Sequence, residues 1–258
     1  REDNGTLKIT TTERKGQVLD GKVVGSIQAG RIRIHSTDDR ATITAQAADL
    51  QAKEVDITAG NANLNGRISR HTDRGKAKIT HQNGVQSRDH QSGSSETYQA
   101  TRVQSDQFNV NVGGKLNISG ADIQAKNSNI PGGNVHLGAE KTVNLREHSK
   151  NQSKGSWYRN EQESSRVETT HRTTIAGDSV NIEATKGKVT TEGAKVSAKT
   201  TAIYGEQGVN LRGTKATTTQ TARAEFKNET ARLKTGLSSQ DSSVQHYTAT
   251  ELTTEQDL

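Results

Sequence analysis

The chain has 258 residues, of which 28% are hydrophobic and only 3% aromatic, with 24 glycines, one proline and a formal net charge of +6. The absence of cysteine excludes disulfides, Cys-ligated zinc and thiol catalysis. Too few aromatic residues remain for a globular core, but Ile, Val and Leu recur at intervals, which suits a thin core extended in one direction.

Charge and hydropathy narrow the classes of partner. Lys and Arg are scattered among Asp and Glu, so no nucleic acid is expected as a partner, because nucleic-acid binders cluster their positive charge. Acidic polysaccharide needs only a diffuse positive field and stays open as a partner. No apolar run approaches the ~18 residues of a membrane span, and no signal peptide is found. The chain also lacks methionine, so we expect a piece of a larger protein whose export signal lies elsewhere.

One pattern occurs three times along the chain. Each copy opens with a small residue, a glycine, a polar step and an apolar–polar–apolar triplet, and closes about thirty residues later on a similar triplet. The near-constant distance predicts a structural repeat. The openings are Ala29–Ile34, Gly113–Ile118 and Ala176–Ile182, and the closings are Ala62–Asn65, Val143–Arg146 and Val209–Arg212.

Short alternating segments lie between these anchors, such as Val55–Ile57, Val135–Leu137 and Val196–Ala198. Each is typical of a strand with one or two inward side chains, and Gly, Asn and Asp between them supply sharp bends. Strands this short need parallel neighbours ~4.8 Å above and below. The sequence therefore predicts an all-β fold, a right-handed parallel β-helix (solenoid) with long polar β-hairpin excursions.

We expect residues 1–258 to form a single β-helix segment in which cores alternate with polar excursions. Candidate hairpin tips are Asn83–Gly84 or Ser92–Ser94, then Lys154–Trp157, then Lys234–Gly236, with surface disorder as the alternative for these stretches. Whether the excursions pair with one another stays open. The expected repeat cores are 23–66, 108–146 and 175–213, and the expected excursions are 67–107, 147–174 and 214–258.

The glycine-led openings, the Val-Asn-Leu closings and the polar stretch Arg146–Gly155 together resemble the haemagglutinin repeats of two-partner-secreted exoproteins. That family includes filamentous haemagglutinin and the contact-dependent growth inhibition effectors. The resemblance covers about residues 20 to 250. It implies a bacterial filament that is secreted or held at the cell surface after export through an outer-membrane transporter.

The resemblance further implies a non-catalytic extracellular segment that acts in cell-surface adhesion or in contact-dependent delivery of a C-terminal toxin. A target-cell surface, membrane or receptor is then the expected partner. The alternative is a polysaccharide-binding or polysaccharide-degrading β-helix protein. No toxin domain and no Val-Glu-Asn-Asn junction occur in the chain, so adhesin and toxin carrier are not distinguished.

Individual residues carry little chemistry. The eight histidines form neither an HxH nor an HExxH pair, so no metal and no other cofactor is expected. The adjacent acids Asp38–Asp39 fall where a corner is expected, and no second carboxylate group is spaced for glycoside hydrolysis, so no catalytic residue and no enzyme is expected. Trp157 and Tyr158, the one local aromatic pair, are candidate contacts for a partner or a membrane interface, with packing against the neighbouring strand as the alternative.

Overall fold

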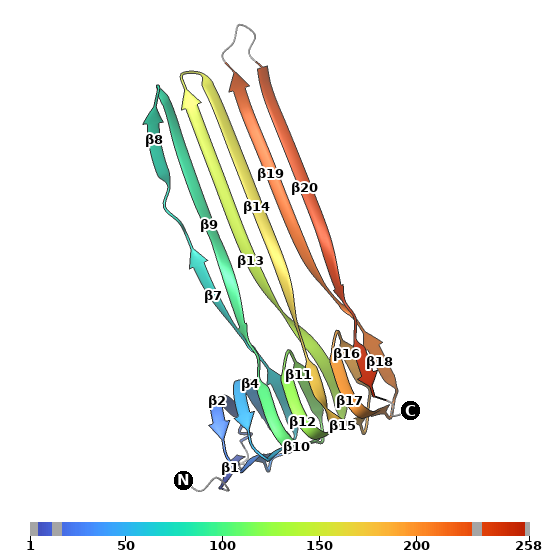
Figure 1. The fold of residues 1–258 in the computed structure, drawn as a ribbon. Helices are drawn as coiled ribbons and strands as arrows, with labels where there is room; N and C mark the ends of the chain where they lie inside the picture. Colours follow the sequence, from blue (N-terminus) through green and yellow to red (C-terminus); the bar gives the residue numbers. More distant parts are fainter. Residues whose placement is uncertain (1–4, 12–16, 229–233, 256–258) are drawn as a thin grey trace.

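The computed structural model describes residues 5–11, 17–228 and 234–255. These residues form strands joined by short turns and corners (Figure 1). The strands are β1 (Thr6–Thr11), β2 (Gly21–Gln28), β3 (Arg31–Ser36), β4 (Thr42–Gln51), β5 (Glu54–Ala59), β6 (Asn61–Asn65), β7 (Arg67–Asp73), β8 (Lys78–Gln82), β9 (Val85–Gln99), β10 (Arg102–Val112), β11 (Lys115–Ser119), β12 (Asp122–Gly132), β13 (Asn134–Lys154), β14 (Trp157–Arg172), β15 (Thr174–Ala184), β16 (Val189–Glu192), β17 (Lys195–Gly205), β18 (Val209–Arg212), β19 (Thr214–Asn228), β20 (Lys234–Thr248) and β21 (Glu251–Thr254).

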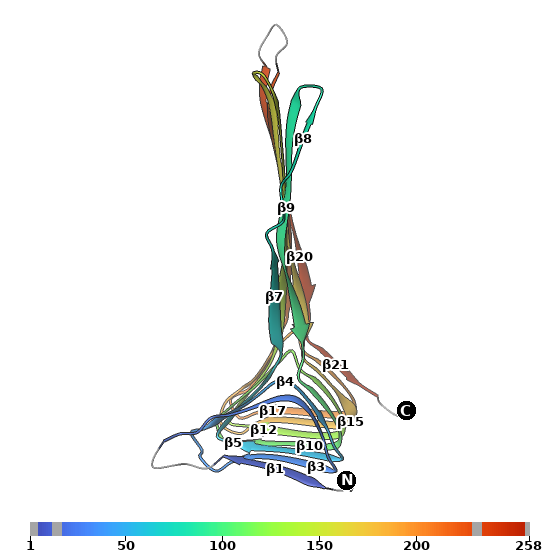
Figure 2. The same ribbon diagram turned by 90° about the vertical axis from the view of Figure 1, so that its left-hand side faces the viewer.

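The chain coils into a rod of triangular cross-section, which Figure 2 shows end-on at the base of the molecule. Three faces of parallel strands make up the rod, and several long strands bend over a corner and serve two faces. The A face contains β1, β3, β5, β10, β12, β15 and β17. The B face contains β2, β4, β6, β11, β13, β16 and β18. The C face contains β2, β4, β10, β12, β15, β17 and β21. The predicted parallel β-helix is confirmed.

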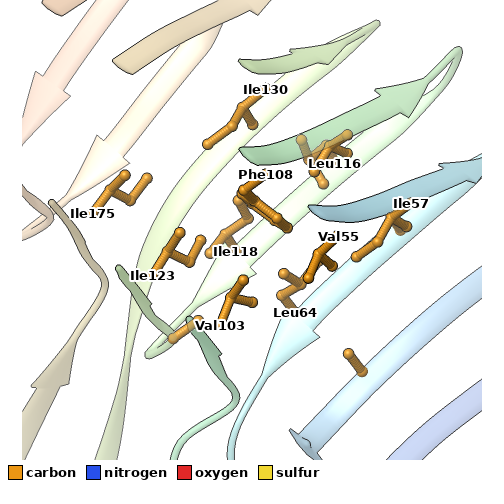
Figure 3. Close-up of a cluster of buried hydrophobic side chains, with 14 of the residues drawn as sticks. Val55, Ile57, Leu64, Val103, Phe108, Leu116, Ile118, Ile123, Ile130 and Ile175 are labelled. Atoms are coloured by element: carbon orange, nitrogen blue, oxygen red, sulfur yellow. The ribbon is translucent and has the colours of Figure 1, made fainter. Parts of the chain in front are cut away.

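Inward side chains stack in columns through the rod, as predicted for a thin core. On the A face, Val55, Phe108, Ser128 and Val180 occupy successive turns. Phe108, which Figure 3 shows near Val55, is fully buried, and the small Ser128 lies beside it in the next turn. A small side chain next to the large ring keeps the packing dense.

The predicted alignment of the three repeats is wrong in the second copy. Leu116–Ile118 stacks on Ala62–Leu64 in the B face, and not on the A face, where Ile32–Ile34 lies. The expected closing triplet Val143–Leu145 lies in a hairpin, and Leu137 holds the position equivalent to Leu64. All these segments share the same apolar–polar–apolar pattern, so the pattern alone does not assign a segment to a face.

Three long hairpins leave the rod, and all of them leave at the corner between the B and C faces (Figure 2). Hairpin 1 consists of β7 and β8 paired with β9, hairpin 2 of β13 with β14, and hairpin 3 of β19 with β20. They also pair with one another, through β9 with β13 and β14 with β19. The result is one antiparallel sheet, the hairpin sheet, which stands on the rod.

From hairpin 1 onward, hairpins alternate with tight corners along the rod. Where no hairpin leaves, the chain turns from the B face to the C face on a residue with positive φ: Gly25 (79°), Ala47 (50°), Gly120 (67°) or Gly193 (69°). In this part of the rod a hairpin therefore occurs once every two turns. Two turns span ~9.6 Å, and two strands of a hairpin are equally wide, so successive hairpins meet edge to edge.

The tips match the predictions in part. Asn83 (φ 53°) and Gly84 (φ 77°) form the predicted two-residue turn between β8 and β9, and Gly155–Ser156 form the turn of hairpin 2. The alternative Ser92–Ser94 is wrong, because Gly93 lies within β9, where a Cβ would meet the carbonyl of Leu145 on β13. Lys234–Gly236 begin β20 and do not form the tip; residues 229–233, between β19 and β20, lie outside the described residues.

Candidate interaction surface

The hairpin sheet is a single layer with both faces exposed, as its edge-on view in Figure 2 shows. We divide it by the cross-strand register. The middle zone comprises 73–78, 89–93, 146–150, 161–165, 220–224 and 238–242. The distal zone lies beyond it and comprises 79–88, 151–160, 225–228 and 234–237. The base lies between the middle zone and the rod.

A threonine closes each hairpin at its base. Thr101 donates to the carbonyl of Asn65 (2.7 Å), across the opening of hairpin 1, and accepts from the backbone N–H of Ala48 in the corner of the neighbouring turn (3.2 Å). Thr173 repeats this arrangement at hairpin 2 with Gly138 O (2.8 Å) and Gly120 N (2.9 Å).

At hairpin 3, Thr250 donates to Arg212 O (2.6 Å). Thr101 and Thr173 are fully buried, so each hydroxyl satisfies backbone groups that water does not reach.

A second contact ties hairpins 1 and 2 to the next corner along the rod. The hydroxyl of Tyr98, at the base of hairpin 1, donates to the carbonyl of Gly120. Arg172, at the base of hairpin 2, donates from Nε to the carbonyl of Gly193 (2.9 Å). Different side chains thus perform the same task, which fixes the angle at which each hairpin leaves the rod.

A carboxylate links each hairpin to the following one. Glu96 on β9 accepts the backbone N–H of Val143 on β13 (2.6 Å), and Glu168 on β14 accepts that of Thr217 on β19 (2.9 Å). Both acids stand where the regular ladder between hairpins ends, so each carboxylate pairs an N–H that has left the ladder. The bond from Thr217, with the Arg166 guanidinium (2.6 Å), holds the pKa of Glu168 below its ordinary value.

Tyr98, Glu140 and His171 form a half-buried cluster where hairpins 1 and 2 join the rod. The rings of Tyr98 and His171 are stacked, with centroids 4.3 Å apart, and Thr142 Oγ1 lies 2.9 Å from His171 Nε2. Burial raises the pKa of Tyr98 and of Glu140 and lowers the pKa of His171. Each shift favours the neutral form, as expected for a packed joint.

The middle zone is polar and hollowed. A cavity of about 840 Å³ spans the middle zone and the adjoining part of the base, and residues from several strands line it, among them His71, Gln91, Asn144 and Gln220. On β13, His148 Nε2 lies 2.9 Å from Asp89 of hairpin 1, and its Nδ1 lies 3.8 Å from Glu163 of hairpin 2. The zone contains no apolar residue larger than alanine, and its six Asp and Glu are balanced by six Lys and Arg.

The distal zone has the opposite character. Trp157 directly follows the turn of hairpin 2, as predicted, and Tyr158 comes next, its hydroxyl donating to Glu225 of hairpin 3 (3.1 Å). That bond raises the pKa of Tyr158. At the tip, Lys154 Nζ donates to the carbonyl of Asn83, which joins hairpins 1 and 2.

The other residues singled out in the sequence have structural surroundings. Asp38 accepts the backbone N–H of Arg40 (2.9 Å) and its guanidinium, which lowers the pKa of Asp38 and fixes the corner after β3. No group of three or more His, Asp or Glu that could hold a metal ion occurs among the described residues. Within those residues, no helix is long and apolar enough to span a membrane.

Sequence reasoning missed the residues at the hairpin base. A signal was present: each threonine ends a polar stretch and precedes an aliphatic residue by two positions, as in Thr101–Val103, Thr173–Ile175 and Thr250–Leu252. The glutamates carry no such mark, because their role depends on which hairpins are neighbours.

The chain was compared with known proteins. The family described as "Hemagglutinin repeat" matches residues 20–155 and 154–256. A protein named "Hemolysin" from Proteus mirabilis is 22% identical over 255 residues, which cover 97% of this chain and 16% of that protein. A "Hemolysin" from Serratia marcescens is 23% identical over 260 residues, which cover 99% of this chain and 16% of that protein. No solved structure matches significantly.

The chain spans about a sixth of the length of these relatives. The family match covers the rod from β2 onward and all three hairpins, and the predicted resemblance is confirmed. This sequence is a segment of an exoprotein of the two-partner-secreted type. The chain belongs to the haemagglutinin-repeat family.

Proposed function

We propose that this chain is a non-catalytic extracellular segment of a bacterial exoprotein, and that it presents the hairpin sheet to another cell, in adhesion or in contact-dependent delivery of a toxin carried elsewhere on the parent chain. The observation that carries the proposal is the joining of three hairpins into one sheet on one corner of a rod. Such a sheet exposes two broad faces to a partner.

The rod supplies stiffness and the hairpins supply reach. Continuous parallel ladders and buried aliphatic columns hold the rod, so a force on the hairpins is transmitted without deforming a loose core. Threonines, glutamates and the Tyr98 and Arg172 contacts hold the hairpins upright. Export through an outer-membrane transporter fits a chain without cysteine, which no disulfide can lock before it crosses.

The relatives' name supports contact with a cell. Both are called hemolysin, and this name supports our proposal of a target membrane as a partner of this chain.

A hairpin-free variant tests the proposal. Each of the segments 65–101, 138–173 and 212–250 is replaced by the Ser-Gly-Ala corner that Ser119–Ala121 forms on the rod, which keeps the strand register on both sides of the junction. We expect the intact chain, labelled on the rod, to bind target cells in flow cytometry, and the hairpin-free rod to bind at background. Equal binding of both proteins would place the contact on the rod and refute the proposal. Circular dichroism checks that the rod still folds.

The cavity of the middle zone supports a second candidate, binding of polysaccharide, because serine, glutamine and asparagine side chains that can bind sugar hydroxyls line it. Incubation with acidic polysaccharides separates the outcomes. Binding without shortening of the polysaccharide supports a binding module, and shortening supports a degrading enzyme. If the chain neither binds nor shortens the polysaccharide, the candidate is excluded.

A further inference from the structure

The distal zone carries a concentration of large apolar side chains that the sheet does not bury. Leu237 is 77% exposed, Ile79 56% and Phe226 41%, and Trp157 is half-buried. They come from all three hairpins, so the register brings together residues that lie far apart in the sequence. The middle zone directly below has nothing larger than alanine, so the apolar character ends abruptly along the hairpins.

These side chains lie on both faces of the sheet. Phe226 pairs with Arg159, and Trp157 lies two residues before Arg159, so Trp157 and Phe226 share one face. Leu237 pairs with Glu225, which pairs with Asn160, and Tyr158 lies two residues before Asn160, so Tyr158 and Leu237 share the other face. A partner that covers one face of the sheet would leave the apolar side chains of the other face in water. A partner into which the end of the sheet inserts would cover the side chains of both faces.

The net positive charge ends at the same boundary. The distal zone holds five Lys and Arg against one Glu, a net charge of +4, and the middle zone holds six Lys and Arg against six Asp and Glu, a net charge of 0. The basic residues of the distal zone, Arg88, Lys154, Arg159, Lys227 and Lys234, are distributed over all three hairpins.

We propose that the distal zone docks end-on onto an anionic lipid bilayer. Trp and Tyr favour the membrane interface because their rings are apolar with one polar atom, and Lys and Arg place their charge among anionic headgroups while their stems lie along apolar surface. The polar middle zone, which has no net charge and no apolar residue larger than alanine, limits the docking to the depth where the distal zone ends. The inference rests on the proposed function, contact with another cell, and names the component of that cell.

Backbone hydrogen bonding sets the same limit on depth. The inner strands β9, β13, β14 and β19 have ladder partners on both sides, but β8 and β20 each pair on one side only in the described structure. Unpaired N–H and C=O groups on those two edges are costly in hydrocarbon and tolerated among hydrated headgroups. The surface therefore fits an interface and does not fit a bilayer core.

Trp157 is the chain's one tryptophan, so its fluorescence reports directly on the proposed contact. The intact chain is mixed with vesicles of phosphatidylcholine and phosphatidylglycerol in a two to one ratio, and separately with phosphatidylcholine alone. We expect a blue shift of the Trp157 emission, protection from iodide and quenching by brominated lipid with the anionic vesicles. Weaker signals are expected with neutral vesicles and at high salt.

Co-sedimentation with the same vesicles measures binding independently of fluorescence. Leu237→Asp is expected to lower the partition coefficient about tenfold or more, because one exposed leucine loses its burial and gains a repelled charge. The matched control is Val244→Asp on the same strand, 53% exposed but at the base, which is expected to change it less than twofold. Arg88→Gln and Lys227→Gln are each expected to lower it about fivefold.

Unchanged Trp157 emission together with no co-sedimentation would overturn the proposal, as would equal loss of binding in Leu237→Asp and Val244→Asp. If target cells bind the chain only through a protein receptor, the chain would not bind vesicles, but cell binding would still require the hairpins. The proposed function would then stand without the proposed lipid contact. If the chain binds no vesicles and its binding to cells does not depend on the hairpins, both the lipid contact and the proposed function are refuted.

Discussion

The rod and the hairpin sheet are built from the same kind of alternating strand, but they differ in what holds them together. In the rod, one face of each strand is inward and dry, and the side chains of successive turns stack in columns. In the hairpin sheet, both faces meet water, so stability depends on the backbone ladder and on a few side chains at the base. The comparison shows that strand alternation alone does not say whether a core lies underneath.

The largest expected effect comes from comparing the two phenylalanines of the chain, because one lies in the rod and the other in the hairpin sheet. Phe108 is fully buried in the rod, and its replacement by alanine is expected to lower the free energy of unfolding by about 3–5 kcal/mol. Phe226 is 41% exposed on the hairpin sheet, and Phe226→Ala is expected to cost less than ~1 kcal/mol. Urea denaturation of both variants measures the difference; similar losses would mean that the hairpin sheet has a core of its own.

The threonines at the hairpin base give the next largest effect. Thr173→Val keeps the shape but leaves Gly120 N without its partner and removes one of the two hydrogen bonds to Gly138 O, and is expected to cost about 1–3 kcal/mol. Thr170, in the same hairpin base, has a buried hydroxyl with no hydrogen-bond partner, so Thr170→Val is expected to be neutral or stabilising. Unfolding free energies that move in the same direction in both variants would contradict the assigned role of Thr173.

The glutamate links are expected to act locally. Glu168→Gln keeps an acceptor but loses its charge, so protection of the Thr217 amide from hydrogen exchange should fall about fivefold while rod amides stay unchanged. Glu163→Gln on the same strand is the control, because its carboxylate accepts no backbone N–H among the described contacts. A loss of protection that spreads into the rod would show that hairpins and rod open together.

The smallest effect is a pH dependence of the joint between hairpins 1 and 2. Burial holds the pKa of His171 below 6.5, so its contribution to stability is complete above pH 6.5 and is lost as the pH falls through its folded-state pKa. Glu140 acts in the opposite sense, because its pKa is raised above 4.5, so its contribution is present below pH 4.5 and is lost as the pH rises through its folded-state pKa.

His171→Phe, which keeps a ring against Tyr98, is expected to reduce the fall in thermal midpoint on acidification from neutral pH to the range below 6.5. An unchanged acid profile would assign the pH dependence to other groups.

The sequence predicted the fold class well because the β-helix depends on local features: period-two strands, glycine corners and polar hairpins with an Asn83–Gly84 turn. It misplaced Val143–Leu145, because those residues alternate like a rod strand but lie in β13 where hairpin 2 leaves the rod. Which face a triplet joins is decided by contacts with other turns, and the sequence of the triplet holds no record of them.

The candidate surface, like the fold, could be predicted from the sequence only in part. Trp157 and Tyr158 stand out by composition alone, and the turn beside them is local. In the sequence, Ile79, Phe226 and Leu237 are isolated apolar residues within polar stretches. Only the strand register shows that they lie together at one end of the sheet. The pairing of β9 with β13 and of β14 with β19, which the sequence left open, is what creates the surface.

The equal width of one hairpin and two turns of the rod constrains how chains of this kind can change length. Deletion or insertion of a single turn between two hairpins would displace them by one strand, so that β9 and β13, or β14 and β19, could no longer meet. Gain or loss of two turns together with one hairpin preserves every junction. Changes in length that preserve the hairpin sheet therefore occur in units of two turns with one hairpin. Each added unit lengthens the rod and widens the hairpin sheet by two strands.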